Sequence, residues 1–260
     1  MTLQEMILIE EAECPANTFA NCFRDKGYAA FYFDESPDLW EGNHAIIYPN
    51  EIKDLGKTLD QVKAFYTKRQ HEAAIFHPLA PEHYHYFEEN RSVIEQHGYE
   101  ITLNDDYHFL TLSGKNTIQR HGLLDIRLLD GWDDRIGSDI ILPAGEPWEL
   151  ASTKAFAQRE GNFLFAGFVG DQPVIYVTLH KSRRFDCVRF DYILCAPEHR
   201  RHGGGNEILS YIVDYCRAQG LSNCFTWPAS PYSERILRKA GFRDAFTARS
   251  GRINAKFVSG

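Results

Sequence analysis

Three consecutive glycines behind two arginines are the residues of this sequence best suited to bind a charged ligand. Gly203, Gly204 and Gly205 follow Arg200 and Arg201. After them, apolar residues recur at the spacing of an amphipathic helix: Ile208, Leu209, Ile212, Val213 and Cys216. A glycine turn lets a ligand approach the backbone closely, and a helix N-terminus directs free N–H groups and a positive dipole toward one point. With the two guanidinium groups, this pattern predicts a site for a phosphate or pyrophosphate.

The spacing of the glycines distinguishes between classes of phosphate-binding loop. A Walker loop requires Lys and then Ser or Thr after its last glycine, whereas Asn206 and Glu207 stand here. A dinucleotide fingerprint, Gly-x-Gly-x-x-Gly, requires a glycine where this chain has Ile208. The residues alone leave one plainer interpretation open, a glycine-rich surface turn beside two solvated arginines.

The motif Arg200-x-x-Gly203-x-Gly205 resembles the Arg/Gln-x-x-Gly-x-Gly/Ala signature of the GNAT superfamily of acyl-CoA-dependent N-acyltransferases. The flanking order is similar too. A hairpin is predicted over residues 163–179, and a helix over 232–240 ends in Gly241 and Phe242. The resemblance covers about residues 122–260. It implies an α/β fold with a mixed sheet and acetyl-CoA as co-substrate.

The resemblance also implies roles for individual residues. The pantetheine arm would follow Ile193, Leu194 and Cys195, and Ser230 would lie near CoA. The pyrophosphate would contact the motif arginine and the loop after it: Arg200, Arg201, His202, Gly203, Gly204, Gly205 and Asn206. Asp191, Asp186 and Glu198 are the nearby carboxylates that could serve as base for the amine. Asp191 is the candidate among them, although it can equally be a solvated strand residue.

One position departs from the family pattern. Many relatives carry a Tyr five residues before the Phe of the Gly-Phe pair, where its hydroxyl protonates the departing thiolate. Here that residue is Leu237, which cannot donate a proton. Tyr232 is the nearest hydroxyl on the same helix and is the candidate acid. We expect turnover without a dedicated tyrosine acid, because a thiolate is a tolerable leaving group.

The reaction implied by the resemblance is the transfer of an acetyl or other acyl group to a primary amine of a small molecule or a peptide. The alternative is a CoA-binding or sensing protein of the same fold that has lost catalysis. The sequence does not name the acceptor, the acyl group or the oligomeric state, and a homodimer is compatible with it.

The first half of the chain repeats the order of elements in the second. The first half is predicted to contain, in order, helix 58–66, strand 73–76, Pro78, helix 84–97 and strand 107–112. The second half has the same order, with helix 206–219, strand 224–227, Pro228, helix 232–240 and a strand after it. Further elements are predicted as a helix over 150–160 and closing strands over 245–248 and 253–258. These patterns predict two tandem GNAT-like domains, with a boundary in the polar segment 113–117. Because α/β folds repeat such units in general, a chance similarity of the halves stays open.

The predicted domains differ in their binding residues. Residues 1–115 would form a degenerate domain, because residues 48–57 contain neither a Gly-x-Gly motif nor an arginine pair. Residues 116–260 would form the catalytic domain that binds acetyl-CoA.

Composition limits the partners. The net charge of −8 disfavours nucleic acid and an anionic membrane, and no apolar stretch reaches transmembrane length. The six cysteines form no Cys-x-x-Cys pair, which favours reduced thiols and a cytoplasmic setting. His83 and His85, with His77 nearby, lack further ligands at metal-site spacing, so we expect no metal.

Overall fold

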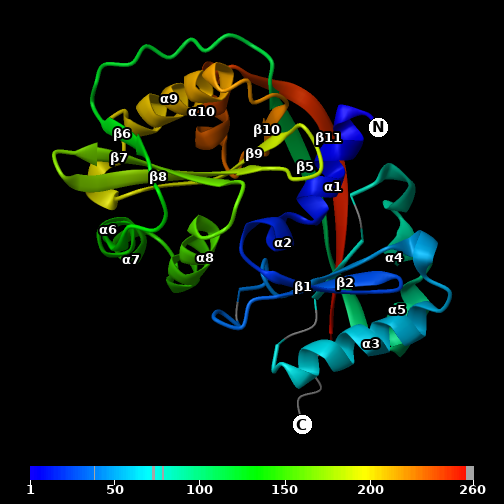
Figure 1. The fold of residues 1–260 in the computed structure, drawn as a ribbon. Coiled ribbons are helices and arrows are strands. Elements are labelled where there is room, and N and C mark those ends of the chain that lie inside the picture. Colours follow the sequence, from blue (N-terminus) through cyan, green and yellow to red (C-terminus); the bar gives the residue numbers. More distant parts are fainter. Residues whose placement is uncertain (38, 72–73, 78, 256–260) are drawn as a thin grey trace. The chain divides into compact units, whose positions relative to one another are not determined.

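The computed structural model describes residues 1–37, 39–71, 74–77 and 79–255 (Figure 1). They divide into two compact units, one of residues 1–107 with 247–255 and one of residues 108–246. Two long strands, β5 (Tyr99–Leu112) and β11 (Phe242–Ala255), have residues in both units. Within the described residues, no helix is long and apolar enough to cross a membrane.

The first unit is a mixed sheet with helices. Its strands are β1 (Asn21–Asp25), β2 (Tyr28–Tyr32), β3 (Ala45–Ile47) and β4 (Ala74–Phe76), and β4 pairs with the end of β11. Strands β3 and β4 are parallel, and the β1–β2, β2–β3 and β4–β11 pairs are antiparallel. The helices are α1 (Leu3–Ala12), α2 (Cys14–Thr18), α3 (Leu55–Lys68), α4 (Tyr86–Glu89) and α5 (Arg91–Gln96). Leu59, Val62 and Tyr66 of α3 belong to the core that covers the sheet.

The second unit also has a mixed sheet. Its strands are β6 (Asp125–Leu128), β7 (Asn162–Val169), β8 (Gln172–Lys181), β9 (Val188–Cys195) and β10 (Cys224–Thr226), and β10 pairs with the end of β5. The β6–β7, β7–β8, β8–β9 and β10–β5 pairs are antiparallel, and β9 and β10 are parallel. The helices are α6 (Asp134–Ile136), α7 (Leu142–Ala144), α8 (Pro147–Ala157), α9 (Gly204–Ala218) and α10 (Pro231–Ala240), with a π-helical turn at Gly137–Ile141.

Alternating side chains of β7 and β8 build a core on each face of this sheet. Phe165, Ile175 and Val177 pack in one cluster with residues of α9 and α10. Leu164, Ala166 and Tyr176 lie in another, with residues of α6 and the π-helical turn. The period of two therefore places α9 and α10 on one face and α6 to α8 on the other (Figure 1).

The two helices beside the glycine loop begin and end at recognisable residues. Helix α10 is capped by a reciprocal pair of hydrogen bonds between Ser230 and Ser233, has Pro231 in its first turn, and ends at Gly241 with φ of 107°. Helix α9 starts after Gly203, whose φ is 91°, and no side chain caps it. Its first turn therefore keeps its backbone N–H groups available.

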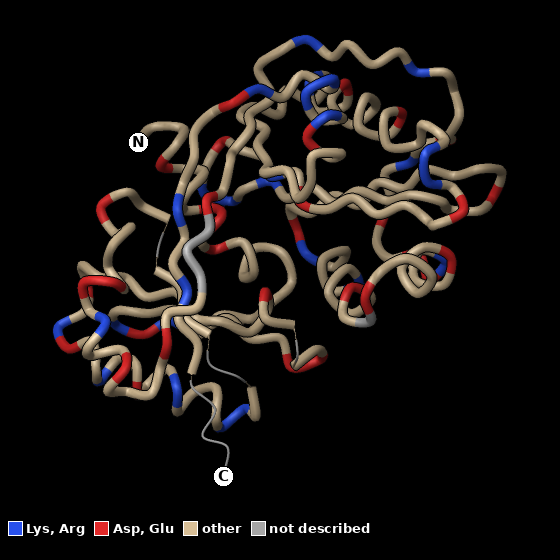
Figure 2. The backbone as a smooth tube through the Cα atoms, turned by 180° about the vertical axis from the view of Figure 1, so that it is seen from behind, with Lys and Arg blue, Asp and Glu red and all other residues tan. Residues whose placement is uncertain are grey.

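Acidic and basic residues are interspersed along both units (Figure 2), but their balance differs. Of the 28 basic and 36 acidic residues, 17 and 16 lie in residues 108–246, and 11 and 20 lie in the remainder. The unit with the glycine loop is thus close to neutral, whereas the other carries the negative charge. An anionic ligand of the second unit meets little repulsion from that unit's net charge.

The α/β class with mixed sheets is confirmed, but four expected elements differ in the structure. The helix expected over 84–97 is interrupted at Asn90, whose side-chain amide donates to the carbonyl of Tyr86 at 2.8 Å and competes with the helix. The two closing strands are one strand, β11, and the strand from 107 begins at Tyr99. Residues 73, 78 and 256–258 of the expected elements lie outside the described residues.

The compact units are not bounded at segment 113–117. Since the end of β11 pairs with β4 through Arg252, Ile253 and Asn254, residues 247–255 belong with the first unit rather than with the predicted domain 116–260. The other division falls within β5, after Tyr107. A domain boundary at 115 remains a prediction from the sequence.

A side chain at Gly241 is expected to destabilise the protein both by backbone strain and by a steric clash. A Cβ there would lie 2.7 Å from the carbonyl oxygen of Gly114, whereas Gly220, also left-handed with φ of 64°, faces open space. Gly220→Ala should lower the free energy of unfolding by about 1 kcal/mol from backbone strain alone. Gly241→Ala should cost at least about 1 kcal/mol more. Urea unfolding of both variants measures the difference, and equal losses would contradict the steric argument.

Candidate functional site

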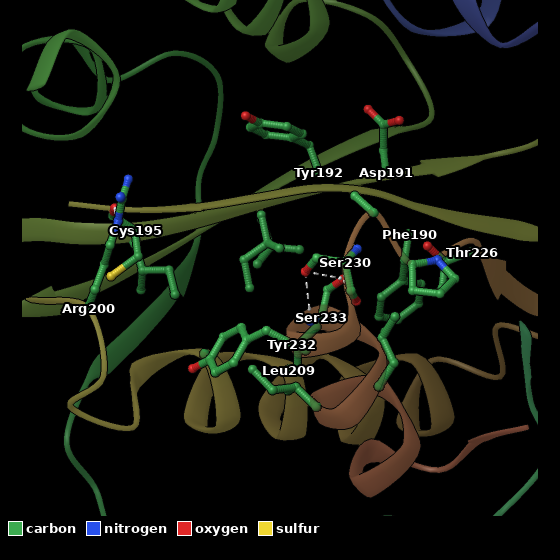
Figure 3. Close-up of a pocket in the computed structure, with 18 of the residues that line it drawn as sticks. Phe190, Asp191, Tyr192, Cys195, Arg200, Leu209, Thr226, Ser230, Tyr232 and Ser233 are labelled. Atoms are coloured by element: carbon green, nitrogen blue, oxygen red, sulfur yellow. Dashed lines mark hydrogen bonds between the residues drawn. The ribbon is translucent and has the colours of Figure 1, made fainter. Parts of the chain in front are cut away.

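A cavity of about 660 Å³ lies in the second unit where β9 and β10 separate (Figure 3). The two strands pair at Val188 with Cys224 and at Arg189 with Phe225; β10 then ends at Thr226 while β9 continues to Cys195. Residues 190–193 and 195 line one side of the cavity, and residues 226–230 line the other. An open strand edge offers backbone N–H and C=O groups to an extended ligand.

The wall of the cavity formed by α9, α10 and β8 is apolar. Leu209 of α9 and Ile236 and Leu237 of α10 line it, together with Ile175 and Val177 of β8. These side chains belong to the core shared by the sheet and the two helices. The cavity therefore suits a ligand with a long, weakly polar arm and a charged end.

The charged end would meet the start of α9. Arg201 and Gly203 both have left-handed backbone, with φ of 66° and 91°. The first helical hydrogen bond runs from the N–H of Glu207 to the carbonyl of Gly203 at 3.1 Å, so the N–H groups of residues 204–206 precede it. Gly205 lines the cavity, and a Cβ there would come within 3.4 Å of Ile236 Cδ1. These features make the N-terminus of α9 a candidate anion site.

The two arginines line the cavity in different ways. Arg200 donates from Nε to the carbonyl of Cys195 at 3.1 Å and from Nη2 to the carbonyl of Ala144 at 3.4 Å. It therefore ties the loop to the end of β9 and to the segment before α8. Arg201 is exposed and follows directly in the loop that leads into α9.

A β-bulge in β9 changes the direction of Asp191. Thr178 of β8 is opposite Tyr192, and Leu179 is opposite Phe190, so Asp191 is the extra residue. Asp191 and Tyr192 consequently both project to the side of β9 away from α9 and α10 (Figure 3). Asp191 forms an ion pair with Arg189 and accepts a hydrogen bond from Thr178 Oγ1 at 3.3 Å. To take up an amine proton, it would have to weaken these interactions.

Residues 134–242 match the family model described as "Acetyltransferase (GNAT) family", and this match contains β7 to β10, the glycine loop and α10. These residues form a GNAT acetyltransferase domain. The motif that begins with Arg200 lies within the matched residues.

Solved structures resemble the chain over nearly its whole length. A GCN5-related N-acetyltransferase from Kribbella flavida superposes with a TM-score of 0.66 at 13% identity, covering 98% of this chain and 96% of that one. A protein from Novosphingobium aromaticivorans assigned to the GNAT acetyltransferases reaches 0.58 at 11% identity, with 96% of each chain covered. Because these matches span both units, the first unit is GNAT-like in fold as well. No curated protein matches this sequence.

The residues assigned to CoA by resemblance fall into three groups in the GNAT domain. The cavity is lined by Ile193, Cys195, Arg200, Arg201, Gly205 and Ser230. Gly203 and Asn206 line a second cavity of about 280 Å³, where the buried Oδ1 of Asn206 has no hydrogen-bond partner among the described residues. His202 and Gly204 line neither of these two cavities, and the side chain of Leu194 packs on the opposite face of the sheet.

Two of the residues that line the cavity, Ser230 and Tyr232, carry hydroxyl groups. Ser230 lines the cavity, but its hydroxyl accepts from the N–H of Ser233 at 3.1 Å and caps α10. Tyr232 also lines the cavity and is 61% exposed, whereas Leu237 is 6% exposed in the wall. The structure thus brings Tyr232 and Leu237 into one cavity with the anion site. It also places Asp191 on β9, at the strand edge that borders this cavity.

Among the described residues, no three His, Cys, Asp or Glu side chains are grouped so that they could hold a metal ion.

Sequence reasoning missed Glu149, which is 5% exposed in α8. The hydroxyl of Tyr192 donates to its Oε1, and its buried Oε2 has no hydrogen-bond partner among the described residues. Burial raises the pKa of Glu149, and this effect exceeds the lowering by the hydrogen bond from Tyr192. The spacing could have revealed it, because Glu149 precedes the buried Thr153 and Phe156 by four and seven residues on one helix face.

The raised pKa of Glu149 predicts a pH dependence of stability. The folded protein binds this proton more tightly than the unfolded chain, so the group's contribution to stability falls as pH rises above about 4.5 through the folded-state pKa. Glu149→Gln cannot ionise and should remove that loss. Between pH 4 and pH 8, its free energy of unfolding should therefore fall less, or rise more, than that of the wild type.

Urea unfolding at several pH values measures this difference. Glu160→Gln, at an exposed residue just beyond α8, is the matched control and should follow the wild type. Parallel curves for all three proteins would contradict the burial effect.

Proposed function

We propose that this protein is an acyl-CoA-dependent N-acyltransferase, which moves an acetyl or other acyl group from CoA to a primary amine of a small molecule or peptide. The observation that carries the proposal is the meeting of two features in one cavity of a GNAT domain. One is the open edge of β9, and the other is the uncapped, glycine-rich start of α9.

Acyl-CoA has chemical groups that suit both features. Its pantetheine arm is extended and contains two amides, which can pair with the backbone edge of β9 near Ile193 and Cys195. Its pyrophosphate suits the N–H groups of residues 204–206, with Arg201 supplying positive charge. Leu194 would contribute through its backbone only, because its side chain packs on the other face.

The chemistry of the transfer sets three requirements. An alkylamine with a pKa of about 10.4 is almost fully protonated at pH 7, so a proton must be removed before it attacks. The thioester oxygen gains negative charge in the transition state, which a backbone N–H at the β9 edge can stabilise. The CoA thiolate then leaves. Since a thiol has a pKa of about 8.5, it needs little help from an acid.

The first test is ligand binding. Acetyl-CoA should bind to the wild type, and Gly205→Trp should abolish binding because the indole would fill the space beside Ile236 where the pyrophosphate enters. The substitution would remove several hydrogen bonds to a charged group, each worth about 1.5–3 kcal/mol. We therefore expect the affinity for acetyl-CoA to fall at least a hundredfold.

Isothermal calorimetry measures the two affinities. Val169→Trp, which adds the same side chain at an exposed strand end outside the cavity, is the control and should bind like the wild type. Equal affinity of Gly205→Trp and wild type would refute the assignment of the loop. Binding without transfer to any amine would favour the inactive CoA-binding protein instead.

A second test concerns the acid. Because Leu237 occupies the wall where many relatives carry a Tyr, the proposal does not rely on a tyrosine acid in α10. Tyr232→Phe should lower kcat less than about tenfold, well below the ~10²–10⁴ typical of losing a general acid. Release of free CoA thiol measures kcat. A hundredfold decrease with unchanged CoA affinity would identify Tyr232 as the acid.

A further inference from the structure

Resting on the acyl transfer proposed above, we propose that Tyr192 and Glu149 form the path by which the acceptor amine loses its proton. Tyr192 would contact the ammonium group, and Glu149, behind it, would receive the proton. The observation behind this assignment is a buried carboxyl in α8, hydrogen-bonded to a partly exposed tyrosine at the bulge of β9.

The place of Tyr192 in the fold supports a contact with the acceptor. Its side chain projects from β9 to the face away from α9 and α10, whereas the anion site and the apolar wall lie on the α9 and α10 face (Figure 3). β9 and β10 do not pair beyond Arg189. A ligand on one face of the sheet and a ligand on the other can therefore meet at the edge of β9. An acyl group held at this edge would have the amine approach from the side of Tyr192.

The carboxyl of Glu149 is held in a defined position. Tyr192 donates to Oε1, and any side chain at Gly145 would collide with Oε2. Only glycine at position 145 leaves room for the carboxyl in this place. Tyr192 itself is 38% exposed, so a molecule outside the protein can reach its side chain.

Other charged or titratable groups surround this pair. Glu146, just before α8, acts on the pKa of Glu149 in two opposite ways: a hydrogen bond from its backbone lowers the pKa, and the weaker like-charge repulsion raises it. Tyr176 of β8 is fully buried beside it, and the Tyr176 hydroxyl lies 3.4 Å from Thr153 Oγ1. Asp191 is adjacent in β9 and paired with Arg189. Of the two carboxyls near the bulge, Glu149 is the one with an oxygen lacking a hydrogen-bond partner among the described residues.

The proton transfer balances within these groups. The N–H bond of the ammonium breaks and a new O–H bond forms at Tyr192, while the original O–H bond of Tyr192 breaks and its proton passes to Glu149 Oε1. The result is a neutral amine with a free electron pair, a neutral tyrosine and a protonated Glu149. The raised pKa of Glu149 favours this transfer, because a more basic carboxylate is a better acceptor.

The test compares wild type, Glu149→Gln and Tyr192→Phe in acetyl transfer from acetyl-CoA to phenethylamine, spermidine and a peptide with a free N-terminus and a lysine. Free CoA thiol is recorded from pH 6 to pH 10. At pH 7, Glu149→Gln should reduce kcat at least a hundredfold, and Tyr192→Phe at least tenfold, with unchanged CoA affinity. The loss should shrink toward pH 10, where the amine is already neutral in solution.

Glu160→Gln is the matched control and should stay within twofold of the wild type. Equal rates of Glu149→Gln and wild type across the pH range would overturn the relay and leave the proposed function intact. Bound CoA with no transfer by the wild type to any of the three amines would overturn both. If Glu149→Gln loses CoA affinity or its folded state, Tyr192→Phe decides, and a rate equal to that of the wild type rejects the relay.

Discussion

The separation of β9 from β10 is the constraint on which the rest of the site depends. Two residue pairs hold the parallel strands together. After the second pair β10 continues for one residue, whereas β9 continues for six. The open edge would cost free energy if it were buried without partners, because backbone N–H and C=O groups need hydrogen bonds. Here it borders a cavity instead. The helices α9 and α10 supply the apolar wall, and the α9 N-terminus supplies the anion site at the cavity's end.

The first unit contains a helix whose start is built differently. Its helix α3 begins at Asp54, whose carboxylate accepts from the N–H of Lys57 at 3.0 Å. The carboxylate satisfies an N–H of the first turn and places negative charge at the helix end, where a phosphate would otherwise bind. Helix α9 begins with glycines and no side-chain cap. The residue at a helix start therefore decides whether the chain itself satisfies the first-turn N–H groups or leaves them for another partner.

Much of the second unit could be predicted from the sequence, because its signals are local. The apolar stripe after Gly205, the hairpin over 163–179 and the glycine at 241 each specify an element through a few neighbouring residues. The bulge at Asp191 could not be predicted, since it depends on register with Thr178, thirteen residues away. The same holds for the contact between Glu149 and Tyr192, and for the assignment of residues 247–255 to the first unit, which follows from pairing with β4.

The hydrogen bonds of Arg200 have a mechanical consequence. One joins its guanidinium to Cys195 at the end of β9, and the other joins it to Ala144, which directly precedes the glycine that makes room for Glu149. The Arg200 side chain thus connects the loop before α9 to the loop before α8. A ligand that attracts the guanidinium would weaken one of these two hydrogen bonds. The two substrates of such an enzyme would then bind interdependently, and the occupancy of one subsite would alter the affinity of the other.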